Sequence, residues 1–384
     1  MKARTLITTL LLLALGTLGV RSQEKVSLVY DLSFDGAFIN NEYDNADEKL
    51  DQSGTVAAAR ISPYLGLRYD EGGAVHRIMA GADFMKDFGS YPVDATRGVG
   101  LDGVDKDIYQ EAALWYQFEK TFGISDLTLA AGVFPRRLAE GRYSGLILSP
   151  EARFYDNNVE GLLLKLRRPR AHYEIALDWN GLYGAKTRER FNVFTYGEGR
   201  LGRFTLGWQG MFQHYADSYD VIGVVDDIVL NPFVEVDLLP GHEPFFLTLN
   251  AGPVVGYARD RRFTESKNLF GGRFVLDAGY RKLGLENSLY YGSSLCPYYL
   301  DQDDAGIVYA KNLYMRSPFY QVVLPEDGDS GAYDRLALFW NPRLGSRVGM
   351  KLSAVFHFAT GGVYLQQIAT LTFDLGPRTL RLGR

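Results

Sequence analysis

Apolar and polar residues alternate along much of the chain with a period of two, which is the period of a β-strand. Segment 171–180 shows this alternation clearly. One set of positions is apolar with aromatic ends, namely Tyr173, Ile175, Leu177 and Trp179. The other set is His172, Glu174, Ala176 and Asp178. A strand of about ten residues with aromatic rings at both interfaces is typical of a transmembrane β-barrel.

The same alternation recurs in other segments, which are 27–35, 111–119, 204–213, 247–257, 273–281, 350–358 and 365–375. Soluble sandwiches and barrels also alternate, so the content of the two faces decides between the classes. Here one face is rich in Leu, Val and Ala with aromatic ends, and the other mixes charged residues with Gly, Ser and Thr. This content favours a lipid-facing exterior around a wet interior over a soluble β protein.

Links between the strands are alternately short and long. The short links are 70–74, 121–126, 168–170, 199–203, 240–244, 282–284 and 342–347. The long ones are 36–53, 87–107, 137–158, 181–190, 216–227, 260–268 and 293–331, with the tight 360–362 as the last. The sequence therefore predicts an all-β fold, a closed antiparallel transmembrane β-barrel of about sixteen strands, with short periplasmic turns and long extracellular loops. The barrel is expected over residues 23–376, and residues 377–384 are expected to form a periplasmic tail.

The first 22 residues predict an export signal peptide. Lys2 and Arg4 precede an apolar run, 6–18, and small residues then surround a cleavage point before Gln23. An N-terminal membrane anchor is the alternative, but the run is shorter than the roughly 20 residues that a spanning helix needs. The single cysteine, Cys296, excludes an internal disulfide.

Composition removes some functional classes. The formal net charge of -5 is not the basic signature of a nucleic-acid-binding protein, so no nucleic-acid partner is expected. The five histidines are not spaced as metal ligands, and no cofactor or metal is expected.

Several stretches resemble a largely uncharacterised group of porin-like outer-membrane proteins from Bacteroidota. They are AGVFPR (131–136), NVEGL (158–162), LDWNG (177–181), RERF (188–191), GLENSLYYG (284–292), SPFY (317–320), YDRL (333–336) and KLSAVFHF (351–358). The resemblance runs from about Val133 to the C-terminus. It implies a barrel in the outer membrane and assigns no substrate and no functional residues.

Charged residues at the inward positions are the candidate functional residues. We expect the lumen to be lined by Arg60, Arg68, Arg77, Asp83, Glu111, Glu119, Arg136, Lys165, Arg167, Glu174, Asp178, Glu235, Asp237, Arg273, Asp277, Arg335 and Lys351. A role in conduction and a purely structural role, in which opposite charges pair across strands, are both open at this point.

The third long loop carries apolar residues among charged ones. Leu146, Ile147 and Leu148 could anchor it to the inner wall. Its charged residues, Arg142, Glu151 and Arg153, would then line a constriction. In sixteen-stranded porins the third loop folds inward and narrows the pore.

Three catalytic or metal patterns are weak. Gly328 to Gly331 matches the core of a serine-protease signature without a partner histidine motif. Asp301 to Gly306 begins like a calcium loop, but its twelfth position is Asn312 in place of Glu. His214 with Asp217, Ser218 and Asp220 is the one cluster that resembles a rim active site, and no enzymatic activity is expected.

These observations predict a porin-like channel in the cell outer membrane for passive diffusion of small polar solutes or ions. The expected surroundings are outer-membrane lipid and lipopolysaccharide. Whether the protein forms a homo-oligomer or binds an outer-membrane partner is not decided by the sequence. A structural or surface-binding barrel is the alternative, motivated by the long aromatic loop 293–331, and a barrel enzyme is the third reading. A histidine–carboxylate pair at hydrogen-bond distance on the rim would favour the enzyme.

Overall fold

The computed structural model describes residues 26–43, 53–88, 108–185, 187–216, 218, 223–263, 265–309, 313–321, 330–342, 344–359 and 362–380. The predicted export signal, residues 1–22, lies outside the described residues.

Strands make up most of the described chain. They are β1 (Val26–Glu42), β2 (Gly54–Glu71), β3 (Ala74–Asp87), β4 (Tyr109–Phe122), β5 (Ser125–Pro135), β6 (Asn158–Arg168), β7 (Ala171–Gly181), β8 (Glu189–Leu201), β9 (Phe204–Ala216), β10 (Val224–Asp237), β11 (Phe245–Asp260), β12 (Glu265–Tyr280), β13 (Leu283–Gly292), β14 (Gly331–Trp340), β15 (Val348–Ala359), β16 (Gly362–Asp374) and β17 (Arg378–Leu380). The helical elements within the described ranges are α2 (Pro150–Tyr155) and the 3₁₀ helices η3 (Arg136–Leu138) and η4 (Pro318–Tyr320).

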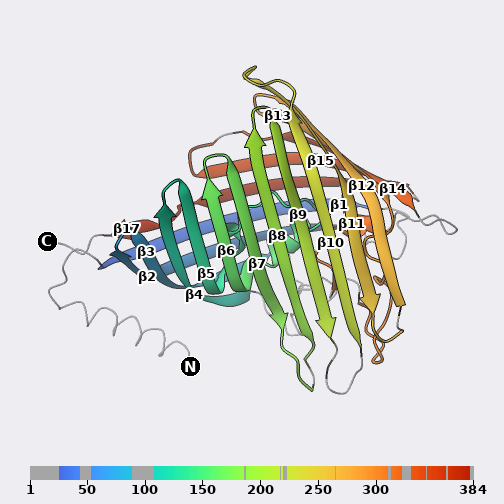
Figure 1. Ribbon diagram of the computed structural model, residues 1–384, viewed down its shortest axis with the longest axis horizontal. Coiled ribbons are helices and arrows are strands. Elements are labelled where there is room, and N and C mark those ends of the chain that lie inside the picture. Colours follow the sequence, from blue (N-terminus) through green and yellow to red (C-terminus); the bar gives the residue numbers. More distant parts are fainter. Residues whose placement is uncertain are drawn as a thin grey trace.

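The strands form a closed antiparallel barrel (Figure 1). Each of β1 to β15 pairs with the next strand along the chain, and β16 pairs with β1 over the register Ser33↔Asp374 to Glu42↔Leu365. Closure pairs the backbone groups that a sheet edge would leave unsatisfied in hydrocarbon, at several kcal/mol each. The predicted fold class, a closed antiparallel barrel of sixteen strands, is confirmed for the described residues.

The C-terminal segment pairs with β1 beyond the point where the pairing of β1 with β16 ends. The sequence places residues 377–384 in a periplasmic tail, whereas Arg378, Thr379 and Leu380 pair with Tyr30, Val29 and Leu28 as β17. Because β1 begins several residues before its partner β16 reaches it, the lower end of β1 is free to take β17 as its neighbour.

Tight two-residue turns join many strands at one end of the barrel. Gly72 and Gly73, with φ of 55° and 76°, link the paired residues Glu71 and Ala74. Two positive φ angles in a row define a turn whose twist matches the strands, and glycine adopts them without steric cost. The long connections lie at the opposite end, which is therefore the extracellular end in barrels of this type.

Strand β1 is longer than the sequence indicates. We expected a loop from Gly36, but β1 runs to Glu42. The polar side chains of this segment form hydrogen bonds with β16. Asn40 donates to Gln367 at 2.8 Å, and Gln366 donates to Asn41 at 2.9 Å. Cross-strand pairing between side chains was not visible in one strand alone.

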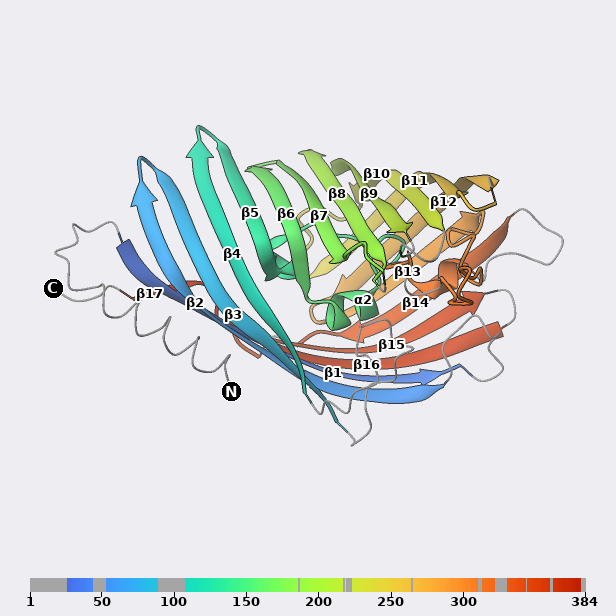
Figure 2. The same ribbon diagram turned by 90° about the horizontal axis from the view of Figure 1, so that it is seen from below.

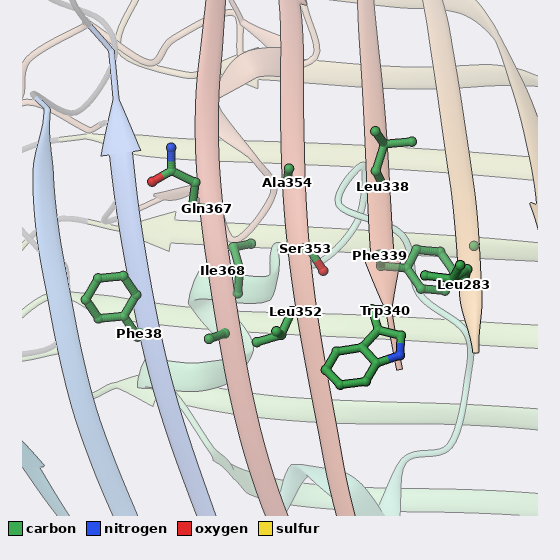
Figure 3. Close-up of a pocket in the computed structure, with 12 residues that line it drawn as sticks. Phe38, Leu283, Leu338, Phe339, Trp340, Leu352, Ser353, Ala354, Gln367 and Ile368 are labelled. Atoms are coloured by element: carbon green, nitrogen blue, oxygen red, sulfur yellow. The ribbon is translucent and has the colours of Figure 1, made fainter. Parts of the chain in front are cut away.

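The two faces of the wall differ as the alternation predicts. Inward positions such as Phe194 and Val229 are 1% exposed, whereas outward positions such as Leu114 are 61% exposed. An apolar groove of about 600 Å³ runs over the outside of β13 to β16 and β1, where Phe38, Leu338 and Trp340 lie (Figure 3). An outer surface this apolar is stable only when something other than water covers it. Among the described residues, no helix has the length and hydrophobicity to cross a membrane.

Candidate functional sites in the lumen and on the outer wall

Loop 3, residues 136–157 between β5 and β6, lies inside the barrel. Figure 2 shows its helix α2 within the ring of strands. Leu146 and Ile147 are fully buried and Leu148 is 3% exposed, in one hydrophobic cluster with inward residues of the wall. Ser149 caps α2 by accepting a hydrogen bond from the Ala152 amide at 3.0 Å.

The base of loop 3 is fixed to β7 by buried polar contacts. Arg136 donates to Asp178 at 2.7 Å and pairs with Asp156 at 2.9 Å. The carboxylate of Glu174 accepts hydrogen bonds from the amides of Glu140 and Gly141 at 2.8 and 2.9 Å. A Cβ atom at Gly141 would lie 2.8 Å from that carboxylate and 2.7 Å from Tyr196 Cβ, so this close approach requires glycine.

Two further arginines of loop 3 reach other parts of the wall. Arg137 donates to Asp31 of β1 at 2.9 Å and pairs with Asp374 of β16 at 3.3 Å. Arg142 pairs with Glu198 of β8 at 2.7 Å and with Glu235 of β10 at 3.2 Å. The loop therefore crosses the lumen and contacts both sides of it.

The remaining candidate residues of loop 3 have neutral partners. Glu151 accepts a hydrogen bond from Gln366 of β16 at 3.2 Å, and Arg153 donates to the Tyr143 carbonyl at 2.6 Å. Both side chains thus help to shape the loop within the barrel.

Loop 7, residues 293–330 between β13 and β14, also packs against the inner wall. Of its described residues, Leu295, Tyr298 and Tyr309 are at most 1% exposed. Loop 7 is bonded to loop 3, because the Ser149 amide donates to the Met315 carbonyl and the Ser317 amide to the Gly145 carbonyl, each at 2.8 Å. The aromatic residues that suggested a surface-binding loop are therefore largely used inside the barrel.

A cavity of about 1050 Å³ remains between the two loops and the wall. Its described charged lining residues are Arg142, Glu151, Asp156, Arg190, Glu235, Arg273, Asp277, Glu286, Arg316, Arg335 and Lys351. With six basic and five acidic residues, the lining is close to neutral. Arg273, Asp277 and Lys351 line the cavity and form no ion pair with another described residue.

All seventeen predicted lumen residues lie at inward positions or, for Arg136, in the loop inside the barrel. Many of them form ion pairs, as expected if these charges have a purely structural role. Within the wall, Arg68 pairs with Asp70, Arg77 with Glu119 and Arg335 with Glu286. Lys165 and Arg167 pair with Glu140 of loop 3. Asp83 accepts hydrogen bonds from Tyr64 and Asn157 and lies 4.0 Å from Arg60, while Glu111 accepts one from Asn158. Asp237 accepts one from the Leu239 amide near a short turn.

A second polar site lies on the outside of the wall at the loop end. His214 Nδ1 is 2.7 Å from Asp226 Oδ1, and Arg261 donates to Asp226 Oδ2 at 2.6 and 2.9 Å. Both His214 and Asp226 alternate with buried inward residues, so they face outward. In the part of the chain that the structure describes, His214 Nε2 has no hydrogen-bond partner.

Register explains why these residues meet. His214 of β9 pairs directly with Asp226 of β10 on one side and with Phe191 of β8 on the other. The Phe191 ring stacks on His214 with centroids 4.7 Å apart, and Trp179 stacks on Phe191 at 5.0 Å. The sequence cluster had placed His214 with Asp217, Ser218 and Asp220, but Asp217 and Asp220 lie outside the described residues and the observed partner is Asp226. Only knowledge of the strand register could have identified it.

The other polar motifs serve local structure. His172 contacts Glu174 at 2.9 Å and His357 contacts the Tyr333 hydroxyl at 2.7 Å. Asp303, in the stretch that begins like a calcium loop, pairs with Arg188. The described residues contain no group of three or more His, Cys, Asp or Glu side chains arranged to hold a metal ion. Gly328 and Asp329 of the protease-like stretch lie outside them.

The closed sixteen-stranded ring with an apolar outer face defines an outer-membrane type of β-barrel. The chain belongs to the lipid A 3'-O-deacylase-type family, whose model matches residues 20–293. No curated protein matches the chain.

Solved barrels of similar fold include the outer-membrane protein OpdK from Pseudomonas aeruginosa, at 12% identity and a TM-score of 0.49, covering 91% of this chain and 99% of that one. OccK2 (OpdF) from the same organism, in complex with glucuronate, has 10% identity and a TM-score of 0.47 over 94% and 100% of the two chains. OccAB3 from Acinetobacter baumannii has 10% identity and a TM-score of 0.45 over 91% and 99%. Similarity at this level carries no information about solute or activity.

Family membership corrects one expectation. From the sequence we expected no enzymatic activity, because the one cluster that resembles a rim active site, His214 with Asp217, Ser218 and Asp220, is a weak pattern. The family is named for an enzyme, so this expectation is wrong. One histidine–carboxylate pair of this chain, His214 with Asp226, is formed between two strands and leaves no local motif in the sequence.

Proposed function

We propose that the protein is a porin-like conduit of the outer membrane that admits small polar solutes or ions by passive diffusion. The observation that carries this proposal is the solvent-accessible cavity of about 1050 Å³ inside the barrel, lined by charged and hydroxyl side chains. A wet lumen removes the cost of transferring a polar solute through hydrocarbon. Neither a nucleotide nor another energy source enters this mechanism.

The lining charges suggest weak ion selectivity. Arg273 and Lys351 favour anions, while Asp277 favours cations, and none of the three is neutralised by an ion pair to a described residue. Since rings of one charge sign are what make a pore strongly selective, this nearly balanced lining predicts passage of both signs.

Liposome swelling tests the proposal. Vesicles containing the refolded mature chain are diluted into isotonic solutions of small neutral sugars or zwitterionic amino acids. Swelling well above that of protein-free vesicles, decreasing with solute size, is expected. Folded barrel that leaves the vesicles no more permeable than the protein-free control would refute the proposal.

A second candidate function is acyl-ester hydrolysis on the outer wall, favoured by the His214–Asp226 pair and by membership of the lipid A 3'-O-deacylase-type family. In this proposal Asp226 holds the Nδ1–H of His214, so that Nε2 removes a proton from an attacking water. The water oxygen bonds to the ester carbonyl carbon, and His214 returns the proton to the departing sugar oxygen. The products are a free fatty acid and an alcohol.

The location of this pair suits a lipid substrate. His214 and Asp226 face outward at the extracellular end, where an acyl ester in the outer leaflet would meet the wall. Arg261 would stabilise a phosphate or the developing oxyanion beside the pair. Incubating the protein with lipopolysaccharide and measuring the mass of lipid A by mass spectrometry tests this candidate. Loss of one acyl chain supports it, and an unchanged lipid A mass with correctly folded protein refutes it.

A further inference from the structure

Arg316 of loop 7 is a buried cation that binds the inner wall. It is 3% exposed and donates to Asp227 of β10, to Gln213 of β9 at 2.8 Å and to the Leu295 carbonyl. Asp227 is fully buried, so its charge has no access to water. A guanidinium can satisfy several acceptors at fixed angles, which makes this contact specific for arginine.

The residues beside Arg316 connect loop 7 to loop 3. The Met315 carbonyl and the Ser317 amide bond to Ser149 and Gly145 of loop 3, each at 2.8 Å. Gln213, which accepts from Arg316, also donates to the Leu313 carbonyl at 3.0 Å. One short segment, Leu313–Ser317, therefore attaches both loops to β9 and β10.

We propose that Arg316 is the positioning residue that holds loops 3 and 7 together as one plug, and that this plug sets the bore of the conduit. This inference rests on the proposed conduit function. Breaking the contact leaves Asp227 charged, buried and unpaired, which strongly favours a rearranged segment that lets water reach the carboxylate. The cavity lining includes both Arg142 of loop 3 and Arg316 of loop 7, so displacement of the plug would widen the passage.

Cys296 supplies a readout that does not depend on conduction. It is the single cysteine of the chain, 3% exposed, and follows Leu295, which accepts a hydrogen bond from Arg316. Burial raises the pKa of the Cys296 thiol to about 12. Since the thiolate is the reactive form, the docked loop leaves the thiol unreactive at pH 8, and release of the loop returns its pKa toward about 8.5.

The experiment compares wild-type protein with Arg316→Gln, with Arg316→Lys as a milder change that keeps the charge, and with Arg170→Gln, an exposed turn residue, as control. A maleimide reagent at pH 8 labels Cys296, and single-channel conductance is recorded on the same samples. We expect labelling at least about tenfold faster in Arg316→Gln, an intermediate rate in Arg316→Lys, and larger conductance steps in both.

Two outcomes would overturn the inference. One is a folded Arg316→Gln or Arg316→Lys barrel that labels at the wild-type rate. The other is faster labelling with unchanged conductance, because the loop would then be released without affecting the bore. A wild-type barrel that does not conduct at all would refute the conduit itself, while the labelling rates would still decide whether Arg316 docks the loop.

Discussion

The imidazole Nδ1 of His214 lies 2.7 Å from the carboxylate Oδ1 of Asp226, on the outside of a barrel whose inside is also polar. Stacking by Phe191 on one side and the Asp226 contact on the other fix the orientation of the ring. The molecule thus carries two separate polar sites, one in the lumen and one on the lipid-facing wall. Variants can test them independently.

Substitution of the outer pair should abolish ester hydrolysis and leave conduction intact. His214→Asn removes the base and Asp226→Asn removes its orienting partner, and each should reduce the rate of acyl release by about 10²–10⁴-fold. His242→Asn, in the turn between β10 and β11 at the other end of the barrel, is the matched control. Equal rates for His214→Asn and wild type would remove His214 from any catalytic role.

Lipid should contact one face of the wall only. Trp179 and Trp340 are 36% and 42% exposed on the outside, whereas Trp115 is 5% exposed on the inside. In single-tryptophan variants reconstituted into brominated lipid, fluorescence of Trp179 and Trp340 should be quenched and that of Trp115 should not. Quenching of Trp115 comparable to that of the outer tryptophans would reverse the inside–outside assignment.

The Arg136–Asp178 pair should be essential for stability. Its side chains are 7% and 0% exposed, so Asp178→Asn leaves a buried guanidinium with only one of its two carboxylate partners, Asp156, at a cost of about 1.5–3 kcal/mol in unfolding free energy. Asp70→Asn breaks the exposed Arg68–Asp70 pair, worth about 0–1 kcal/mol. Urea unfolding in detergent compares the two, and similar losses would show that the buried pair has no special role.

Removal of the centre of loop 3 should enlarge the passage. Deletion of residues 141–152 takes away Arg142, Glu151 and the apolar anchors around Ile147 that fill the lumen. Larger single-channel conductance is expected from the deletion variant. An unchanged conductance would mean that loop 3 does not limit the flow.

Alternation and turn chemistry were sufficient to predict the barrel, because both are local properties of each strand. The paired glycines at 72 and 73 mark a hairpin in the sequence alone, and the structure has one there. The inward positions of Glu174 and Asp178 likewise follow from the period of two.

The contacts between distant elements could not be predicted in this way. Arg137 reaches Asp31 and Asp374 only because loop 3 crosses the lumen, and Arg316 reaches Asp227 only because loop 7 turns inward. Such contacts depend on which strands face each other across the barrel, and no spacing within one segment encodes that. The His214–Asp226 pair was missed because it depends on the register between the neighbouring strands β9 and β10.

Single-channel recording of the refolded mature chain in a planar bilayer under a salt gradient tests the central claim most directly. The conduit proposal predicts stable open steps and, because the cavity lining is close to neutral, a reversal potential near zero. A correctly folded barrel that gives no steps would contradict the proposal and leave the outer wall as the place where the protein acts.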